Sequence, residues 1–225
     1  MEGLPAPRGD PLTTPWARAA DDDPLDGLRA AVTTADCGYE PQGGYEDRCW
    51  ILHTVHDGPV RLRWDEVLSR AGRRIADWQG TLSHLVFEGV EGMHDLEGPD
   101  PAEMDRACLA RLVEHLVRSG PQGPDTPCAG VRAPVATSHE EGMLHGERLV
   151  ARRGRLGDAL AHHDAMPDGW FPATWWAADG SWLVLTDFDL NATEVFGDAA
   201  LIAGLLADPE LDAVRHPTIA ESLGS

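Results

Sequence analysis

Two aspartates in the last third of the chain come closest to a metal-binding pattern. Asp187 and Asp189 are two residues apart in an expected β-strand, so both side chains would point to one face and could hold a divalent cation. The run that starts there, DFDLN, also resembles the beginning of an EF-hand loop, but Ala192 occupies the position that requires glycine. The alternative is that these carboxylates face water and help to form a turn.

Histidines supply two further candidate sites. His139 and His145 flank a pair of glutamates and have ligand types that suit zinc, but they are six residues apart instead of the four of the zinc-binding H-E-x-x-H helix. A solvated loop is the alternative for this group. The run His162–Asp164 could supply a base with an orienting carboxylate. A histidine that interacts favourably with a helix C-terminus is the plainer interpretation.

Several catalytic classes lack their motifs in this chain. There is no lysine, which removes the P-loop phosphate clamp and Schiff-base chemistry, and neither G-x-S-x-G nor a strand followed by G-x-G-x-x-G occurs. Cys49 and Cys108 fall in an expected strand and on an apolar helix face, which favours core packing over a nucleophilic role. Cys37 and Cys128 fall in expected loops. The sequence therefore predicts no catalytic residue and no cofactor.

The charge of the chain is strongly acidic. Eighteen basic residues, all arginine, against 38 acids give a net charge of −20. This argues against nucleic-acid binding and against docking to anionic lipid, because both need a positive surface. It suits a basic protein partner, although solubility alone is the alternative explanation.

The acids and aromatic residues of 164–198 are the expected grip on such a partner. Beyond Leu156 there are twelve acids and one base, Arg215. The predicted partner-binding residues are Asp164, Asp168, Trp170, Trp175, Asp179, Asp187, Asp189 and Glu194.

Periodicity and turn residues predict the elements of the N-terminal half. Residues 1–22 are expected to be an extended or partly disordered arm that Trp16 pins to the body. The expected elements that follow are a helix over 24–34, a loop over 37–47, a hairpin with strands 48–56 and 60–64, a helix over 65–80, a strand over 81–87, and a helix that a capping box at Asp100–Glu103 opens and Gly120 ends.

The C-terminal half is expected to follow a long connection, which is a linker or loop over 121–142 rich in proline. A strand over 147–152 and a short helix over 156–163 come next. Asp179-Gly180 then marks a tight hairpin between two tryptophan-containing strands. A third strand, ATEVF, precedes a helix that starts at Gly197-Asp198.

These patterns predict an α+β fold with small antiparallel sheets, a hairpin and a three-stranded meander, and with helices packed on one face. The expected organisation is the arm 1–22, an α+β half over 23–120, the linker 121–142, and a meander with a helix over 143–225. The N-terminus lacks the apolar stretch of a signal peptide, and no apolar run is long enough for a membrane span. We therefore expect a cytoplasmic protein with reduced thiols.

The stretch 171–217 resembles a segment of uncharacterised acidic actinobacterial proteins, which are loosely similar to immunity proteins that neutralise toxins. The residues that carry this resemblance are Pro172, Trp175-Trp176, Asp179–Trp182, Thr186-Asp187, Asp189, Thr193, Gly197, Leu205-Leu206 and Asp208-Pro209. They are tryptophans, glycines and turn formers, so the resemblance implies a fold and no catalytic residue. An arginine-rich, lysine-free composition is also typical of a GC-rich actinobacterial genome.

Three functional hypotheses follow. The first is an acidic protein-binding module, of immunity type, that neutralises a basic partner. The second is a small metal-dependent hydrolase or transferase with its metal at Asp187 and Asp189, or at His139 and His145. The third is a subunit of a larger assembly, because the sequence does not determine an oligomeric state.

Overall fold

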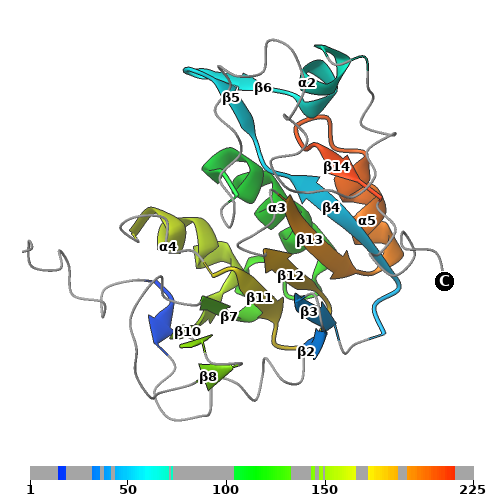
Figure 1. The fold of residues 1–225 in the computed structure, drawn as a ribbon. Helices are drawn as coiled ribbons and strands as arrows, with labels where there is room; N and C mark the ends of the chain where they lie inside the picture. Colours follow the sequence, from blue (N-terminus) through cyan, green and yellow to red (C-terminus); the bar gives the residue numbers. More distant parts are fainter. Residues whose placement is uncertain are drawn as a thin grey trace, which may run out of the picture.

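The computed structural model describes residues 15–18, 32–35, 38–41, 44–70, 72, 104–132, 143–144, 147–148, 150–165, 172–186 and 192–215. Most of these residues belong to one antiparallel sheet and to the helices that pack on it (Figure 1). The α+β fold class is therefore confirmed. The sheet is larger than the two small sheets that the sequence suggested.

Eight strands form this sheet in the order β1-β10-β7-β11-β12-β13-β4-β14. Every neighbouring pair is antiparallel. The strands are β1 (Ala17–Arg18), β4 (Asp47–Leu52), β7 (Pro127–Arg132), β10 (Val150–Arg155), β11 (Thr174–Ala177), β12 (Leu183–Thr186), β13 (Ala192–Gly197) and β14 (Ala213–Val214). The expected three-stranded meander is confirmed as β11-β12-β13, with Asp179-Gly180 in its first turn.

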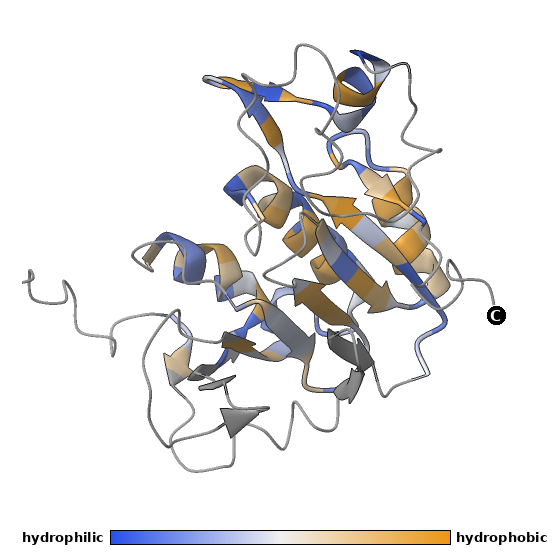
Figure 2. Cartoon of the chain, in the orientation of Figure 1, coloured by the Kyte–Doolittle hydropathy of each residue, from blue (hydrophilic) through white to orange (hydrophobic). Residues whose placement is uncertain are grey.

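Three helices cover one face of the sheet: α3 (Arg106–Ser119), α4 (Ala159–Ala165) and α5 (Ala199–Leu206). Strand residues from neighbouring positions in the register, Trp175, Val184, Val195 and Cys49, share a core with the apolar sides of these helices. The apolar colour of β12 and α5 in Figure 2 reflects this burial. Burying these side chains is the main source of stability.

The opposite face of the sheet is buried as well. Trp176, Leu183 and Phe196 occupy one row on that face and are all nearly inaccessible. The ring of Tyr45 packs on Phe196 with their centroids 5.9 Å apart. A sheet that is covered on both faces explains why its strands are rich in apolar residues at successive positions.

The remaining elements are short. Two 3-10 turns, η4 (Gly123–Asp125) and η5 (Leu156–Asp158), precede β7 and α4. Three separate hairpins pair β2 (Val32–Ala35) with β3 (Gly38–Pro41), β5 (Val55–Asp57) with β6 (Val60–Leu62), and β8 (Met143–Leu144) with β9 (Glu147–Arg148). Helix α2 (Trp64–Arg70) follows β6, and its buried Trp64, Val67 and Leu68 form a second apolar cluster with Leu52 and Val55.

Helix α3 confirms the expected helix but begins later than the sequence suggested. Met104 and Asp105 are not helical, and Asp105 is the N-cap, where its Oδ1 accepts hydrogen bonds from the backbone N–H groups of Ala107 (2.8 Å) and Cys108 (3.0 Å). The capping box expected at residues 100–103 lies outside the described residues. Gly120 ends the helix as expected, and its N–H donates to the carbonyl of Leu116 at 3.0 Å.

The structure differs from the predicted elements in four places. Residues 32–35 form strand β2, so the helix expected over 24–34 is wrong for 32–34, where β-branched residues favour a strand. Strand β3 replaces part of the loop expected over 37–47. The strand expected over 48–56 is broken at His53-Thr54. Strand β7 occupies 127–132, so the expected linker is wrong for those residues.

The sheet draws on both expected halves of the chain. Strand β4 comes from 23–120, yet it lies between β13 and β14, which come from 143–225. Strand β7, from the expected linker, lies between β10 and β11. The expected helix beyond residue 72 and the expected strand over 81–87 lie outside the described residues. None of the helices in the described ranges has the length and apolarity to cross a membrane.

Candidate functional site

The predicted partner-binding acids that the structure describes lie on three different elements. Asp164 is exposed on α4 and forms a two-pronged ion pair with Arg106, at 2.6 and 2.7 Å. Asp179 is exposed in the β11–β12 turn, where its Oδ1 accepts a hydrogen bond from Ser181 N at 3.0 Å. Glu194 lies on β13, 3.7 Å from Arg48. These three acids therefore do not form one patch.

Trp175 was expected to be an exposed anchor for a partner, and this prediction is wrong. Its side chain is buried on the helix-covered face, with its ring 5.1 Å from that of Trp182 in an edge-to-face arrangement. A strand near the middle of a sheet that is covered on both faces leaves no exposed side for a large ring. The other candidates, Asp168, Trp170, Asp187, Asp189, His139 and His145, lie outside the described residues.

The arginine side chains that the structure describes are engaged within the molecule. Arg61 donates to Cys108 Sγ and to the carbonyl of Glu210, while Arg152 and Arg153 have interactions of their own. The described arginines that form ion pairs are Arg48, Arg63, Arg70, Arg106, Arg111, Arg118, Arg155 and Arg215. Within the described ranges, the arginines are therefore committed to partners of their own.

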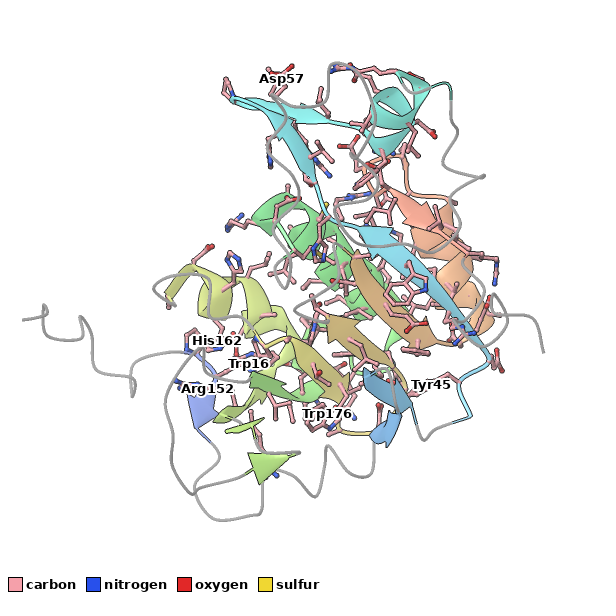
Figure 3. The ribbon with its side chains drawn as sticks, viewed as in Figure 1. Trp16, Tyr45, Asp57, Arg152, His162 and Trp176 are labelled. Atoms are coloured by element: carbon pink, nitrogen blue, oxygen red, sulfur yellow. The ribbon has the colours of Figure 1, made fainter. Side chains whose placement is uncertain are left out.

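Five exposed carboxylates make no ion pair within the described part of the chain: Glu46, Asp57, Asp179, Asp198 and Glu210. Two of them, Glu46 and Asp198, lie together because β4 and β13 pair with Asp47 opposite Gly197. Asp57, by contrast, is at the far end of the molecule from Tyr45, which is next to Glu46 (Figure 3). We call Tyr45, Glu46 and Asp198 the acidic edge.

Both carboxylates of the acidic edge are oriented by the first turn of α5. Glu46 Oε2 accepts a hydrogen bond from Ala199 N at 3.1 Å, and Asp198 Oδ1 accepts one from Leu201 N at 2.7 Å. Each uses one oxygen, so the second oxygen remains available to a ligand. The positive end of a helix stabilises ionised carboxylates. The edge therefore presents two fixed negative groups.

An ion pair lies next to the acidic edge, and the ring of Tyr45 forms part of it. Arg215 binds both carboxylate oxygens of Asp47, and this hydrogen bonding lowers the pKa of Asp47. Tyr45 is half-buried against Phe196, and burial raises its pKa, so the phenol is neutral. An aromatic ring beside free carboxylates is a surface on which a guanidinium group can stack.

A second group of polar side chains surrounds the N-terminus of α3. The hydroxyl of Thr54 donates a short hydrogen bond to Asp105 Oδ2 and lies 3.6 Å from Cys108 Sγ. Arg61 Nη2 is 2.9 Å from the same sulfur. Burial tends to raise the pKa of Asp105, but hydrogen bonds from Thr54 and the Cys108 amide outweigh it and lower the pKa. Asp105 is therefore an ionised helix cap.

The three cysteine thiols that the structure describes are unsuited to nucleophilic chemistry. Burial raises the pKa of Cys49, Cys108 and Cys128 to about 12, so each is protonated at neutral pH. The core positions expected for Cys49 and Cys108 are confirmed. Cys128 was expected in a loop, but it is buried in β7.

The groups around His53, His162 and His163 are not arranged as a catalytic pair. His53 is buried and its Nε2 lies 2.9 Å from the hydroxyl of Thr193, which is 2.7 Å from that of Thr186. His163 Nδ1 is 3.4 Å from Asp164, but Arg106 holds that carboxylate. His162 is buried against Trp16, and burial lowers its pKa to about 4. No group of three metal-type ligands occurs among the residues that the structure describes.

The acidic edge could not be read from the sequence. Asp198 lies at the end of the expected grip region 164–198 but was not among the partner-binding residues named, and Glu46 follows a glycine-rich stretch without periodicity. The two acids are 152 residues apart and meet through a strand register that no local pattern encodes. Comparison with known proteins adds no further information, because no family model, curated protein or solved structure matches the chain.

Proposed function

We propose that this protein is an acidic protein-binding module that docks a basic partner at the acidic edge. The observation that carries this proposal is the imbalance of charge on the described surface. The described arginine side chains are held in intramolecular interactions, whereas some described carboxylates are exposed and make no ion pair there, two of them side by side at Glu46 and Asp198.

The geometry suits an arginine or lysine of the partner. The free oxygens of Glu46 and Asp198 can accept hydrogen bonds from a guanidinium group, and charge-assisted hydrogen bonds are stronger than neutral ones. The ring of Tyr45 offers a face for stacking. The net charge of −20 would speed the approach of such a partner and disfavour acidic proteins.

The state of the reactive groups favours binding over catalysis. The three described cysteines are protonated and buried, and the two most buried histidines, His53 and His162, lie within the fold. Neutralisation of a basic toxin is the finer form of the proposal, and it rests on the resemblance of residues 171–217 to immunity-like proteins.

Site-directed crosslinking tests the docking surface. A photo-crosslinking amino acid replaces Tyr45 in the full chain, and a second variant carries it at Val60, which is exposed on the distant β5–β6 hairpin. We expect a basic protein to crosslink through position 45 and not through position 60. Mass spectrometry then identifies the partner, which is purified for binding measurements.

Neutral variants of equal charge test the grip itself. Glu46→Gln with Asp198→Asn keeps both side-chain shapes and the cap of α5, while Asp57→Asn with Asp179→Asn removes the same two charges elsewhere. We expect the first pair to weaken binding roughly tenfold or more and to reduce its dependence on salt. Equal affinities for the two double variants would contradict the proposal.

The metal-dependent alternative remains a prediction for Asp187 and Asp189 or His139 and His145. Its test is the melting temperature with and without Mg²⁺, Mn²⁺, Ca²⁺ or Zn²⁺. A rise that Asp187→Asn and Asp189→Asn abolish would favour the metal-dependent enzyme over the binding module.

A further inference from the structure

Trp16 is a buried side chain that attaches the short strand β1 to the edge of the sheet. It is fully inaccessible, although it adjoins the exposed Pro15 and Ala17. Its indole Nε1 donates a hydrogen bond to the carbonyl of Arg155 at 3.0 Å. Its ring stacks on that of His162, with centroids 5.3 Å apart and planes 6° apart (Figure 3).

The site that receives this ring is shaped for it. A Cβ atom at Gly154 would lie 2.2 Å from Trp16 Cδ1, so only glycine at that position lets the indole lie flat on β10. Trp175 closes another side of the space, with its ring 6.3 Å from that of Trp16. We call the space bounded by Gly154, Arg155, His162 and Trp175 the indole slot.

The indole slot is built without the help of β1. Its residues come from β10, α4 and β11, which are held by strand β7 between β10 and β11 and by the packing of α4 with α3. Trp16 is 139 residues away from its hydrogen-bond partner in the sequence. The slot therefore belongs to the body of the protein, and residues 15–18 are its ligand in the same chain.

The backbone pairing of β1 adds little to this attachment. Strand β1 is the outermost strand, and its register joins only Ala17 to Arg153 and Arg18 to Arg152. A two-residue strand at a sheet edge that a buried tryptophan anchors is the kind of element that can pair in trans.

We propose that residues 15–18 of one copy can occupy the indole slot of a second copy, which gives a strand-exchanged dimer. The second copy is the occupant because the only segment that the structure shows to fit the slot is the chain's own. The segment in the same chain competes at a high effective concentration, so exchange requires concentrated protein or an empty slot. The dimer joins two strongly acidic chains, so added salt should favour it.

Two complementary variants test the exchange. Trp16→Ala leaves the slot empty and removes the anchor, whereas Gly154→Val fills the slot and leaves a competent anchor on the same chain. Each variant alone should be monomeric in sedimentation and native mass spectrometry, while their equimolar mixture should form a heterodimer. Absence of the heterodimer from a mixture in which both variants are folded, as judged by circular dichroism, would overturn the proposal.

A peptide of residues 10–22 keeps the test decisive if Trp16→Ala is too unstable to purify well. Added in trans, this peptide should raise the melting temperature of Trp16→Ala, and the same peptide with alanine in place of tryptophan should bind roughly tenfold more weakly or not at all. Failure of the tryptophan peptide to bind would overturn the proposal. Peptide binding without a heterodimer would likewise overturn the dimer, because the slot would then accept the segment but not from a second folded copy.

Discussion

Asp208 binds Arg111 through one oxygen, with its Oδ2 2.7 Å from Nη2 and 3.1 Å from Nε of the arginine. The same oxygen lies 2.7 Å from His115 Nε2. Arg111 and His115 are one turn apart on α3, and Asp208 follows α5, so this carboxylate ties two helices of the covered face together. Its other oxygen accepts a hydrogen bond from Glu210 N at 2.9 Å.

Replacing this carboxylate should destabilise the fold. We expect Asp208→Asn to lower the free energy of unfolding by about 2 kcal/mol, because hydrogen bonds to a charged group are lost and Arg111 is left partly covered without its partner. Asp179→Asn, in an exposed turn, is the matched control and should change stability little. Urea unfolding measures both, and equal stabilities would show that the pair between the helices contributes nothing.

The pH dependence of the same pair has a definite sign. Burial tends to raise the pKa of Asp208, but hydrogen bonds from the Glu210 amide, His115 and Arg111 outweigh it and lower the pKa below its ordinary value of 3.8. The unfolded chain then binds the proton more readily, so the contribution of Asp208 is present above pH 3.8 and is lost as the pH falls through the lowered value. The free energy of unfolding of Asp208→Asn should therefore depend less on pH than that of the wild type, and only in that acid range.

His162 acts in a higher and separate pH range. Burial, then the charges of Arg152 and His163, lower its pKa from 6.5 to about 4. Between these two pH values His162 is protonated in the unfolded chain but not in the folded chain. The free energy of unfolding should therefore decrease as the pH falls from 6.5 to about 4, by up to about 3 kcal/mol. His162→Phe keeps a ring against Trp16 and should remove this slope, whereas His163→Gln should leave most of it, because burial is the largest cause of the lowered pKa of His162. Denaturant unfolding at several pH values distinguishes them.

The predictable part of the fold is the part that local chemistry determines. Asp179-Gly180 lies in the turn between β11 and β12 as predicted, and Gly180 tolerates the φ of +73° found there. The Gly180 N–H donates to the carbonyl of Ala177 at 3.0 Å, so Ala178 and Asp179 are the central residues of the turn and the hairpin is not the two-residue type that the dipeptide suggested. The flanking strands are rich in aromatic and β-branched residues. Asp198 caps α5 and Gly120 ends α3, as their types suggested. The role of Trp16 as an anchor was also foreseen, because a large apolar ring in a polar, proline-rich segment needs a place to bury.

The unpredictable part depends on pairing between distant segments. Strand β4 joins β13, and Glu46 meets Asp198, through a register between residues about 150 positions apart. A proline-rich stretch that reads as a linker contributes β7, whose Gly130 lies under Pro172 so closely that a Cβ atom there would be 2.6 Å from the proline ring. Two adjacent tryptophans in a strand point to opposite faces of a sheet and cannot reveal whether one face or both are covered, which is why Trp175 was wrongly placed at the surface.

The buried thiols should resist modification in the folded protein. Cys49, Cys108 and Cys128 are at most 3% exposed, and their raised pKa values leave almost no thiolate at pH 8. Iodoacetamide should therefore label these three only after unfolding in guanidinium chloride. Peptide mass spectrometry of native and unfolded samples measures the labelling. Rapid labelling of Cys108 in the native state would reveal access to the group formed by Thr54, Asp105 and Arg61.

The sequence pattern and the structure place the start of α3 at different aspartates. The pattern places the cap at Asp100, whereas in the structure Asp105 caps the helix and also accepts the hydrogen bond of Thr54. Asp105→Ala should cost about 2 kcal/mol of unfolding free energy, because it leaves two helix N–H groups and a buried hydroxyl without their acceptor. Asp105→Asn, which can still cap, should cost about half as much. Asp100→Ala should be nearly neutral, and a loss as large as that of Asp105→Ala in urea unfolding would mean that the helix starts at the earlier aspartate.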